Sequence, residues 1–123
     1  MSGTALIFHL CPRALWEAAL ARGAYYGRPA DLADGYIHCS SAAQLRASAA
    51  KHAAGQADLV LLALDPDSLG SSLRWEPSRQ GELFPHIYGG MPVSAVLRTD
   101  PVPLDAEGQH QFPSWLEDSA EFR

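Results

Sequence analysis

The apolar residues of this chain come in short runs, and the longest extends from Leu59 to Leu64 in the stretch DLVLLALD. A continuous apolar run of this length, bounded by aspartates and followed by Pro66, is typical of a strand buried on both faces. A helix that spans a bilayer needs roughly 20 apolar residues. The run therefore predicts a central strand and excludes a membrane-spanning segment.

The remaining pattern predicts an α+β domain with about five strands and two main helices. The first helix has Pro12 at its first position and ends at Gly23. The second begins at a capping box, Ser41 to Gln44, and ends near Gly55, with Leu45, Ala49 and His52 as its inner stripe. The predicted strands lie at Thr4–Leu10, Tyr36–Cys39, Asp58–Asp65, Leu73–Glu76 and within Val93–Leu104.

Two segments, Ala24–Gly35 and Ser78–Pro92, are predicted as long loops because they are rich in turn-forming residues. The second carries several aromatic side chains, which suits the wall of a pocket. At 123 residues the chain fits one domain, residues 1–104, with residues 105–123 as a polar C-terminal tail. The side chains expected to dock this tail on the body are Phe112, Trp115 and Leu116.

The charge of the chain restricts its partners. Its formal net charge is -5, from 14 acidic and 9 basic residues, and no dense Lys/Arg run is present to neutralise a nucleic-acid backbone. A small anionic ligand remains compatible with this balance. Cys11 and Cys39 lack CxxC spacing, and the N-terminus lacks a secretory pattern. We therefore expect a cytoplasmic protein with reduced thiols and no membrane partner.

The stretch DGYIHCSS places three polar side chains on one face of a predicted strand. Tyr36, His38 and Ser40 alternate with residues that face the core. Ser40 and Ser41 also begin a helix, whose free N–H groups attract anions. This pattern favours a ligand site. The alternative is that the serines only cap the helix and that His38 is a hydrogen-bonded structural histidine.

Three further segments carry candidate site residues. His9 stands in the apolar strand IFHL, and His86 precedes Tyr88 in the glycine-rich segment FPHIYGG. Arg74 and Glu76 share a face of LRWE, and an arginine suits a phosphate or carboxylate. The structural alternatives are a satisfied core histidine and a solvated ion pair.

The sequence offers little support for a cysteine nucleophile, a zinc site or a glycine-rich phosphate loop. Cys39 and His38 are neighbours in a strand and face opposite sides, so they cannot act as a nucleophile and its base. A zinc site made of the three histidines lacks a supporting spacing, and no metal is assigned. No phosphate-binding glycine motif occurs.

The segments IFHL, DGYIHCSS, DLVLLALD, LRWE and FPHIYGG, in this order, resemble the bacterial family called domain of unknown function 952. The resemblance covers about residues 5–97. That family is grouped by fold with the ADP-ribosyltransferases, so the resemblance implies a split, mostly antiparallel sheet that grips NAD between its halves. It implies that His9 matches the histidine that binds the NAD ribose, and that Tyr36 or His38 matches a second polar position. The resemblance also implies a glutamate late in the chain that contacts the nicotinamide ribose. No residue matches its position clearly; by its chemistry Glu76 is the first candidate and Glu82 the second.

Two functions stay open. The first is an enzyme that acts on NAD or a related ADP-ribose compound, by group transfer or by cleavage of a glycosidic bond, with His9, His38 and Glu76 as its catalytic candidates. The second is a non-catalytic module whose cleft binds a small ligand or a partner. In both, the ligand-binding candidates are Tyr36, Ser40, Ser41, Arg74, His86 and Tyr88.

Overall fold

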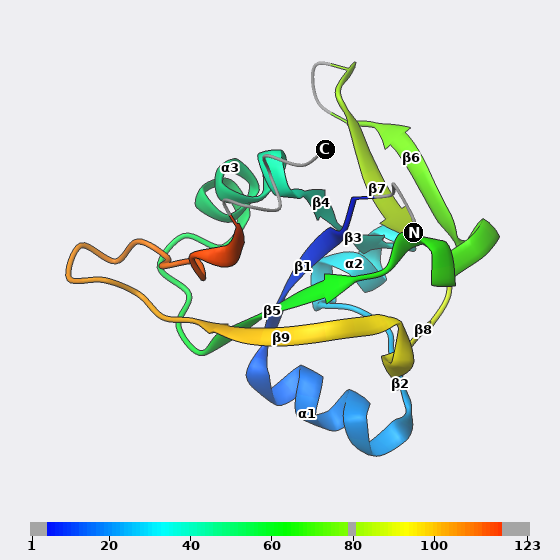
Figure 1. Cartoon of the computed structure of the whole chain (residues 1–123), viewed down its shortest axis with the longest axis horizontal. Helices are drawn as coiled ribbons and strands as arrows, with labels where there is room; N and C mark the ends of the chain where they lie inside the picture. Colours follow the sequence, from blue (N-terminus) through cyan, green and yellow to red (C-terminus); the bar gives the residue numbers. More distant parts are fainter. Residues whose placement is uncertain (1–4, 79–80, 117–123) are drawn as a thin grey trace.

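The computed structural model describes residues 5–78 and 81–116, which form an α+β fold with antiparallel sheets (Figure 1). The four-stranded sheet has the order β4 (Ser40–Ser41), β1 (Ile7–Pro12), β5 (Leu59–Leu64) and β9 (Val96–Val102). The three-stranded sheet has the order β3 (Ile37–His38), β7 (Leu83–Ile87) and β6 (Leu73–Pro77). A third sheet pairs β2 (Ala24–Tyr25) with β8 (Met91–Pro92).

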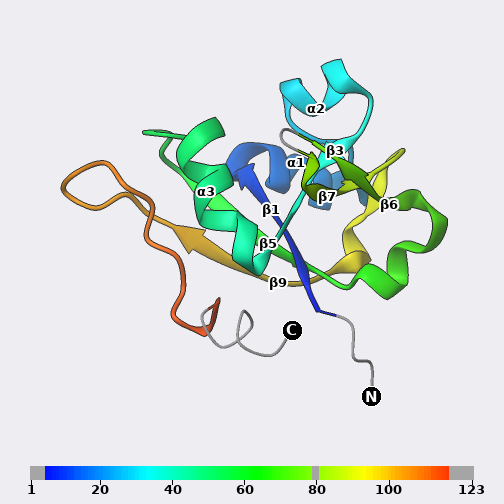
Figure 2. The ribbon, with the colours of Figure 1, turned by 90° about the horizontal axis from the view of Figure 1, so that it is seen from above.

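The helices are α1 (Arg13–Arg22), α2 (Pro29–Asp34) and α3 (Ala42–His52), with short 3₁₀ turns at Pro66–Ser72 and Val93–Ala95. Figure 2 shows α2 beside β3, away from β9.

The core lies on both faces of β5. Every residue of β5 is buried, and alternate side chains enter two different clusters. Leu62 packs in the cluster that includes Trp16 of α1, whereas Leu61 packs in the cluster that includes Leu45 of α3. The alternation follows from the two-residue period of a strand. The predicted central strand is therefore confirmed.

The predicted start of α3 is confirmed, whereas α1 begins one residue later than predicted. Pro12 is the last residue of β1 and the N-cap residue of α1, and Gly23 ends this helix in a left-handed conformation at φ 88°. The backbone N–H of Gln44 donates to Ser41 Oγ at 3.2 Å, and the Ser41 N–H donates to Gln44 Oε1 at 3.0 Å. The prediction that His52 belongs to the inner stripe of α3 is wrong, because its side chain is exposed.

The segment Ala24–Gly35 is not a loop, which corrects the prediction. It contains β2 and the helix α2. Pro29 occupies the first turn of α2, Asp31 accepts from the free N–H of Arg28, and Gly35 ends the helix at φ 90°. A proline at the start, an acidic residue in the first turn and a glycine at the end form the pattern of a helix.

The segment Ser78–Pro92 is also misassigned as a loop, because it contains β7 and β8. Pro85 stands inside β7, the middle strand of its sheet. The carbonyl of Pro85 accepts from Cys39 N at 3.0 Å, so the side of Pro85 that lacks an N–H faces the end of β3. The missing donor therefore interrupts no β6–β7 hydrogen bond.

The predicted strand Tyr36–Cys39 is divided. Its first part, β3, pairs with β7, whereas Ser40 and Ser41 form β4 and pair with β1. The chain passes from one sheet to the other at Cys39. The described residues form nine strands rather than five, mainly because the additional ones are short or contain proline.

The last strand, β9, lies at a sheet edge with Pro101 near its end, as predicted. In the tail, Leu116 is buried, and Phe112 and Trp115 pack against the cluster on the α3 side of β5. Residues 117–123 lie outside the described residues. No helix in the described ranges combines the length and the apolar character that crossing a membrane requires.

Candidate functional site

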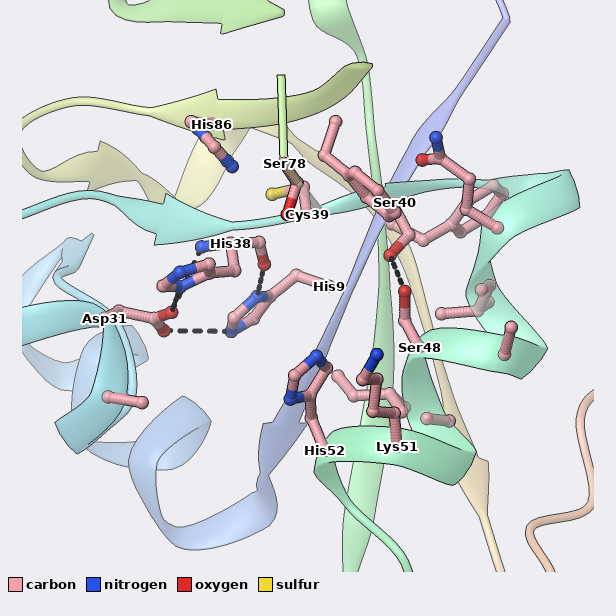
Figure 3. Close-up of a pocket in the computed structure, with 18 of the residues that line it drawn as sticks. His9, Asp31, His38, Cys39, Ser40, Ser48, Lys51, His52, Ser78 and His86 are labelled. Carbon is pink, nitrogen blue, oxygen red and sulfur yellow. Dashed lines mark hydrogen bonds and ion pairs between the residues drawn. The ribbon is translucent and has the colours of Figure 1, made fainter. Parts of the chain in front are cut away.

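A cavity of about 580 Å³ lies among α3, α2 and the strands β1, β3 and β7 (Figure 3). Four of the predicted site residues line it, and they come from segments far apart in the sequence. They are His9, His38, Ser40 and His86. The other predicted residues, Tyr36, Ser41, Arg74, Glu76 and Tyr88, do not line this cavity.

The centre of the site is Asp31, a carboxylate of α2 in a segment whose sequence predicts a loop. Its side chain is only 3% exposed. Oδ1 accepts from the ring Nδ1 of His38 at 2.5 Å and from the backbone N–H of His38 at 3.1 Å, and Oδ2 accepts from the Arg28 N–H at 2.6 Å. Burial alone would raise the pKa of Asp31, but the hydrogen bond from His38, the nearby His9 and these N–H groups lower it. Asp31 is therefore an ionised, buried carboxylate.

The ring of His38 lies between two carboxylates. Nδ1 bonds to Asp31, and Nε2 lies 3.0 Å from Asp34 Oδ2 at the end of α2. The hydrogen bond to Asp31 raises the pKa of His38 above its ordinary value, burial opposes this shift, and the charges of Asp31 and Asp34 add to it. The geometry favours an imidazolium at a partly exposed position.

His9 is buried and connects the two larger sheets. Its Nδ1 lies 2.6 Å from the carbonyl oxygen of His38, and its Nε2 lies 2.6 Å from the Tyr25 hydroxyl. Because a carbonyl only accepts, Nδ1 carries the proton, and the Tyr25 hydroxyl donates to Nε2. Burial lowers the pKa of His9, which keeps this ring neutral. Both nitrogens of His9 are thus engaged within the protein, and we assign His9 to positioning of His38.

A second imidazole–carboxylate pair lies on the three-stranded sheet. His86 Nδ1 is 2.7 Å from Glu76 Oε1, which also accepts from the Tyr88 hydroxyl at 2.7 Å. These hydrogen bonds, first that from His86 and then that from Tyr88, lower the pKa of Glu76. The Arg74 guanidinium lies over the Tyr88 ring at 5.0 Å. Glu76 therefore orients His86, and Arg74 and Tyr88 support Glu76.

Aromatic contacts bring the two imidazoles together. His38 and His86 are direct partners across β3 and β7, with ring centroids 5.6 Å apart. Tyr36 stacks on His86 at 4.0 Å and also contacts the ring of His38 at 4.7 Å. The ring nitrogen of His86 that is not bonded to Glu76 can act as a base toward a ligand.

The two serines at the start of α3 have different roles. Ser41 caps the helix through its hydroxyl, so the structural alternative holds for this residue. Ser40 is buried, lines the cavity and donates to Ser48 Oγ at 3.2 Å. The thiols offer no nucleophile, since burial raises the pKa of Cys11 to about 11 and also raises that of Cys39.

Several cavity residues were missed from the sequence. Asp31 had a readable signal in Pro29, which starts a helix, and in Gly27 just before it. Gly27 has φ 109°, and a Cβ there would lie 2.6 Å from the Cβ of Asp31, so only glycine lets the chain pass this carboxylate. The side chains that α3 contributes had no such signal, since a polar helix face normally meets solvent. They include Ser48, Lys51 and His52.

A metal site finds no support in the part of the chain that the structure describes, where no group of three His, Cys, Asp or Glu side chains is arranged to hold an ion.

A family model described as "Protein of unknown function (DUF952)" matches residues 10–99. The crystal structure of protein CC0527 from Caulobacter crescentus is 45% identical, with a TM-score of 0.84 over 94% of this chain and 98% of that chain. Its solution NMR structure is 44% identical, with a TM-score of 0.77 over 94% of this chain and 97% of that one. None of the curated proteins matches the chain.

Proposed function

The chain belongs to the DUF952 family, and we propose that its cavity binds NAD or a related ADP-ribose compound and cleaves the glycosidic bond. The observation that carries the proposal is the pairing of His38 and His86. Each ring is held through Nδ1 by a carboxylate, and the two lie side by side at a cavity of about 580 Å³, a volume typical of small-molecule sites. An ADP-ribosyltransferase-like binding mode for NAD is part of this proposal.

The proposed reaction is a hydrolysis. The free ring nitrogen of His86 accepts a proton from water as the water oxygen bonds to C1′ of the ribose, and the bond from C1′ to the nicotinamide nitrogen breaks. Nicotinamide leaves as a neutral molecule, ADP-ribose is the other product, and the proton on His86 is released to solvent. The carboxylates at the cavity stabilise the positive charge that develops on the ribose. They are Asp31 and Asp34.

The other candidate residues support this step. Glu76 holds His86 in position, and Tyr36 fixes the plane of the His86 ring by stacking. His38 adds positive charge beside the cavity, which favours an anionic ligand. His9 positions His38 through the backbone carbonyl.

A second function is favoured by a specific observation. His38 Nε2 faces Asp34, and both nitrogens of His9 are engaged inside the protein, so of these two rings and His86, His86 alone has a nitrogen open to act as a base. This arrangement suits a non-catalytic module in which the same cavity binds the compound without cleaving it.

The test is a calorimetric titration with NAD and with ADP-ribose, followed by a single-turnover assay for released nicotinamide. We expect saturable binding, and we expect His86→Gln to abolish release while leaving the fold intact. The matched control is His110→Gln, since His110 is a partly buried histidine that does not line the cavity. Binding without release supports the non-catalytic module, and the absence of binding by both compounds overturns both functions.

A further inference from the structure

We propose that the α3 side of this cavity is a phosphate subsite, formed by Ser48 and Lys51 with His52 beside them. This inference rests on the proposed function and specifies which end of the ligand lies at α3. It assigns recognition of a phosphate or diphosphate group to residues that the resemblance does not point to.

The helix α3 has two different inner faces. Leu45 and Ala49 are buried in the core. Ser48, Lys51 and His52 are the polar residues near the end of α3 that line the cavity, and their spacing of three and four residues places them on one face of the helix. Figure 3 shows Lys51 and His52 reaching from the end of α3 toward the space beside Ser48 and His9. A polar face of α3 is therefore turned toward the cavity.

Lys51 is the only lysine in a sequence that has 14 acidic residues. None of the ion pairs formed between described residues includes it. An ammonium without a carboxylate partner at a cavity is suited to bind an anion from solution.

The hydroxyl groups of Ser40 and Ser48 also suit a ligand that accepts hydrogen bonds. Ser40 is 6% exposed and its hydroxyl donates to Ser48 Oγ at 3.2 Å. Because two hydroxyls share a single hydrogen bond, one of the two keeps a proton for another acceptor at the cavity. A phosphate oxygen is such an acceptor and would receive hydrogen bonds from both Ser48 and Lys51.

Two carboxylates of α2 also line the cavity. Asp31 and Asp34 carry negative charge there, and both pair with His38. A third lining carboxylate, Glu82, accepts from the Gln44 side chain at 2.9 Å near the start of α3, whereas Lys51 stands near the end of this helix. The proposal therefore places the phosphates of the ligand at the Lys51 end of α3 and its reacting ribose at the histidines.

The experiment uses the single lysine as a probe. Reductive methylation with ¹³C-formaldehyde keeps the charge of Lys51 and labels it together with the N-terminal amine, and Lys51→Gln identifies which NMR signal belongs to Lys51. We expect ADP and inorganic pyrophosphate to shift the Lys51 signal saturably, and adenosine to leave it unchanged. No shift with either phosphate compound overturns the subsite.

Affinities of the unlabelled variants provide the second measurement. We expect Lys51→Gln to weaken ADP binding by about tenfold or more, as loss of a charge-assisted hydrogen bond does, and Ser48→Ala to weaken it less. The matched control is Arg46→Gln, a cation of the same helix whose guanidinium lies over Phe112 at 5.4 Å and which does not line the cavity. Equal weakening by Lys51→Gln and Arg46→Gln indicates general surface charge and contradicts the subsite.

The phosphate subsite and the proposed function can fail independently of each other. Pyrophosphate binding that depends on Lys51, without binding or cleavage of NAD, keeps the phosphate subsite and overturns the NAD proposal. Cleavage of NAD with unchanged affinity in Lys51→Gln keeps the proposed function and overturns the subsite.

Discussion

The two imidazole–carboxylate pairs of this site are built in opposite ways. In the pair of Asp31 and His38 the carboxylate is 3% exposed and the ring is 41% exposed. In the pair of His86 and Glu76 the ring is 6% exposed and the carboxylate is 31% exposed. The carboxylate is the buried residue of the first pair, and the imidazole is the buried residue of the second. The first pair therefore holds a charged ring at the cavity, whereas the second holds a buried ring through a more accessible carboxylate.

The pairs also differ in how many groups depend on the carboxylate. Asp31 accepts two backbone N–H groups in addition to the His38 ring, so it holds the start of α2 and the start of β3 together. Within the described residues, the Glu76 carboxylate accepts from two side chains, those of His86 and Tyr88. The first pair is therefore part of the fold, and the second serves mainly to position a ring.

The largest expected effect comes from removing the buried carboxylate. Asp31→Ala should lower the free energy of unfolding by about 3 kcal/mol, because it leaves the backbone N–H groups of Arg28 and His38 without their acceptor and removes one of the two carboxylates that bind the His38 ring. Denaturation by urea measures this change, and Glu76→Ala is the matched comparison, with a smaller expected loss. Equal losses in the two variants would contradict the difference between the pairs.

A smaller effect is expected from Tyr25→Phe, which removes the donor to His9 Nε2. His9 in turn donates to the backbone carbonyl of His38, the histidine of the first pair. We expect a loss of about 1–3 kcal/mol in the free energy of unfolding, since the buried nitrogen loses its hydrogen bond. Tyr26→Phe is the control, because Tyr26 is 52% exposed and a surface change of this kind alters stability by about 0.5 kcal/mol or less. If Tyr25→Phe lowers the free energy of unfolding no more than Tyr26→Phe does, the hydrogen bond from Tyr25 to His9 adds nothing to stability.

The pH dependence should distinguish the two histidines of the first pair. The pKa of His38 is raised, so its stabilisation is complete below about pH 6.5 and is lost as the pH rises through its folded value. The pKa of His9 is lowered, so the fold loses stability as the pH falls below about 6.5, where the unfolded chain takes up a proton that buried His9 does not. NMR titration of the ring protons should place the His38 midpoint above and the His9 midpoint below the ordinary histidine value; the reverse order contradicts the assignment.

The smallest change in stability is expected for Glu76→Gln, since the amide oxygen still accepts from His86 and Tyr88. The variant should fold as the parent does, and its main effect should be a slower single-turnover release of nicotinamide with a changed pH–rate profile, because the ring of His86 loses its anionic partner. A rate and pH profile equal to those of the parent would remove Glu76 from the positioning of His86.

Much of the fold follows from local pattern. The buried run in β5, the capping box of α3 and the edge position of Pro101 are each set by neighbouring residues and were predicted correctly. The errors fall where a long-range contact overrides the local signal. Pro85 is tolerated in a middle strand only because β3 ends opposite it, and the sequence around Pro85 does not contain that information.

For the site as well, the features set by local pattern were predictable and those set by long-range contacts were not. Side chains that alternate along one strand, such as Tyr36 and His38, were placed together correctly, since a strand has a period of two. The pairing of His86 with Glu76 crosses β6 and β7, and the pairing of Asp31 with His38 depends on how α2 packs next to β3. These distances depend on how the elements pack against one another.

By itself, the sequence determined that this chain has a buried strand core and that imidazoles stand in otherwise apolar segments, because hydrophobic period and turn chemistry act over a few residues. Only the tertiary structure decided which carboxylate holds which ring, and that a polar face of α3 with the only lysine borders the same cavity. The physical reason is that the charge and hydrogen bonding of a buried group depend on neighbours brought together by packing, and packing is a property of the whole chain.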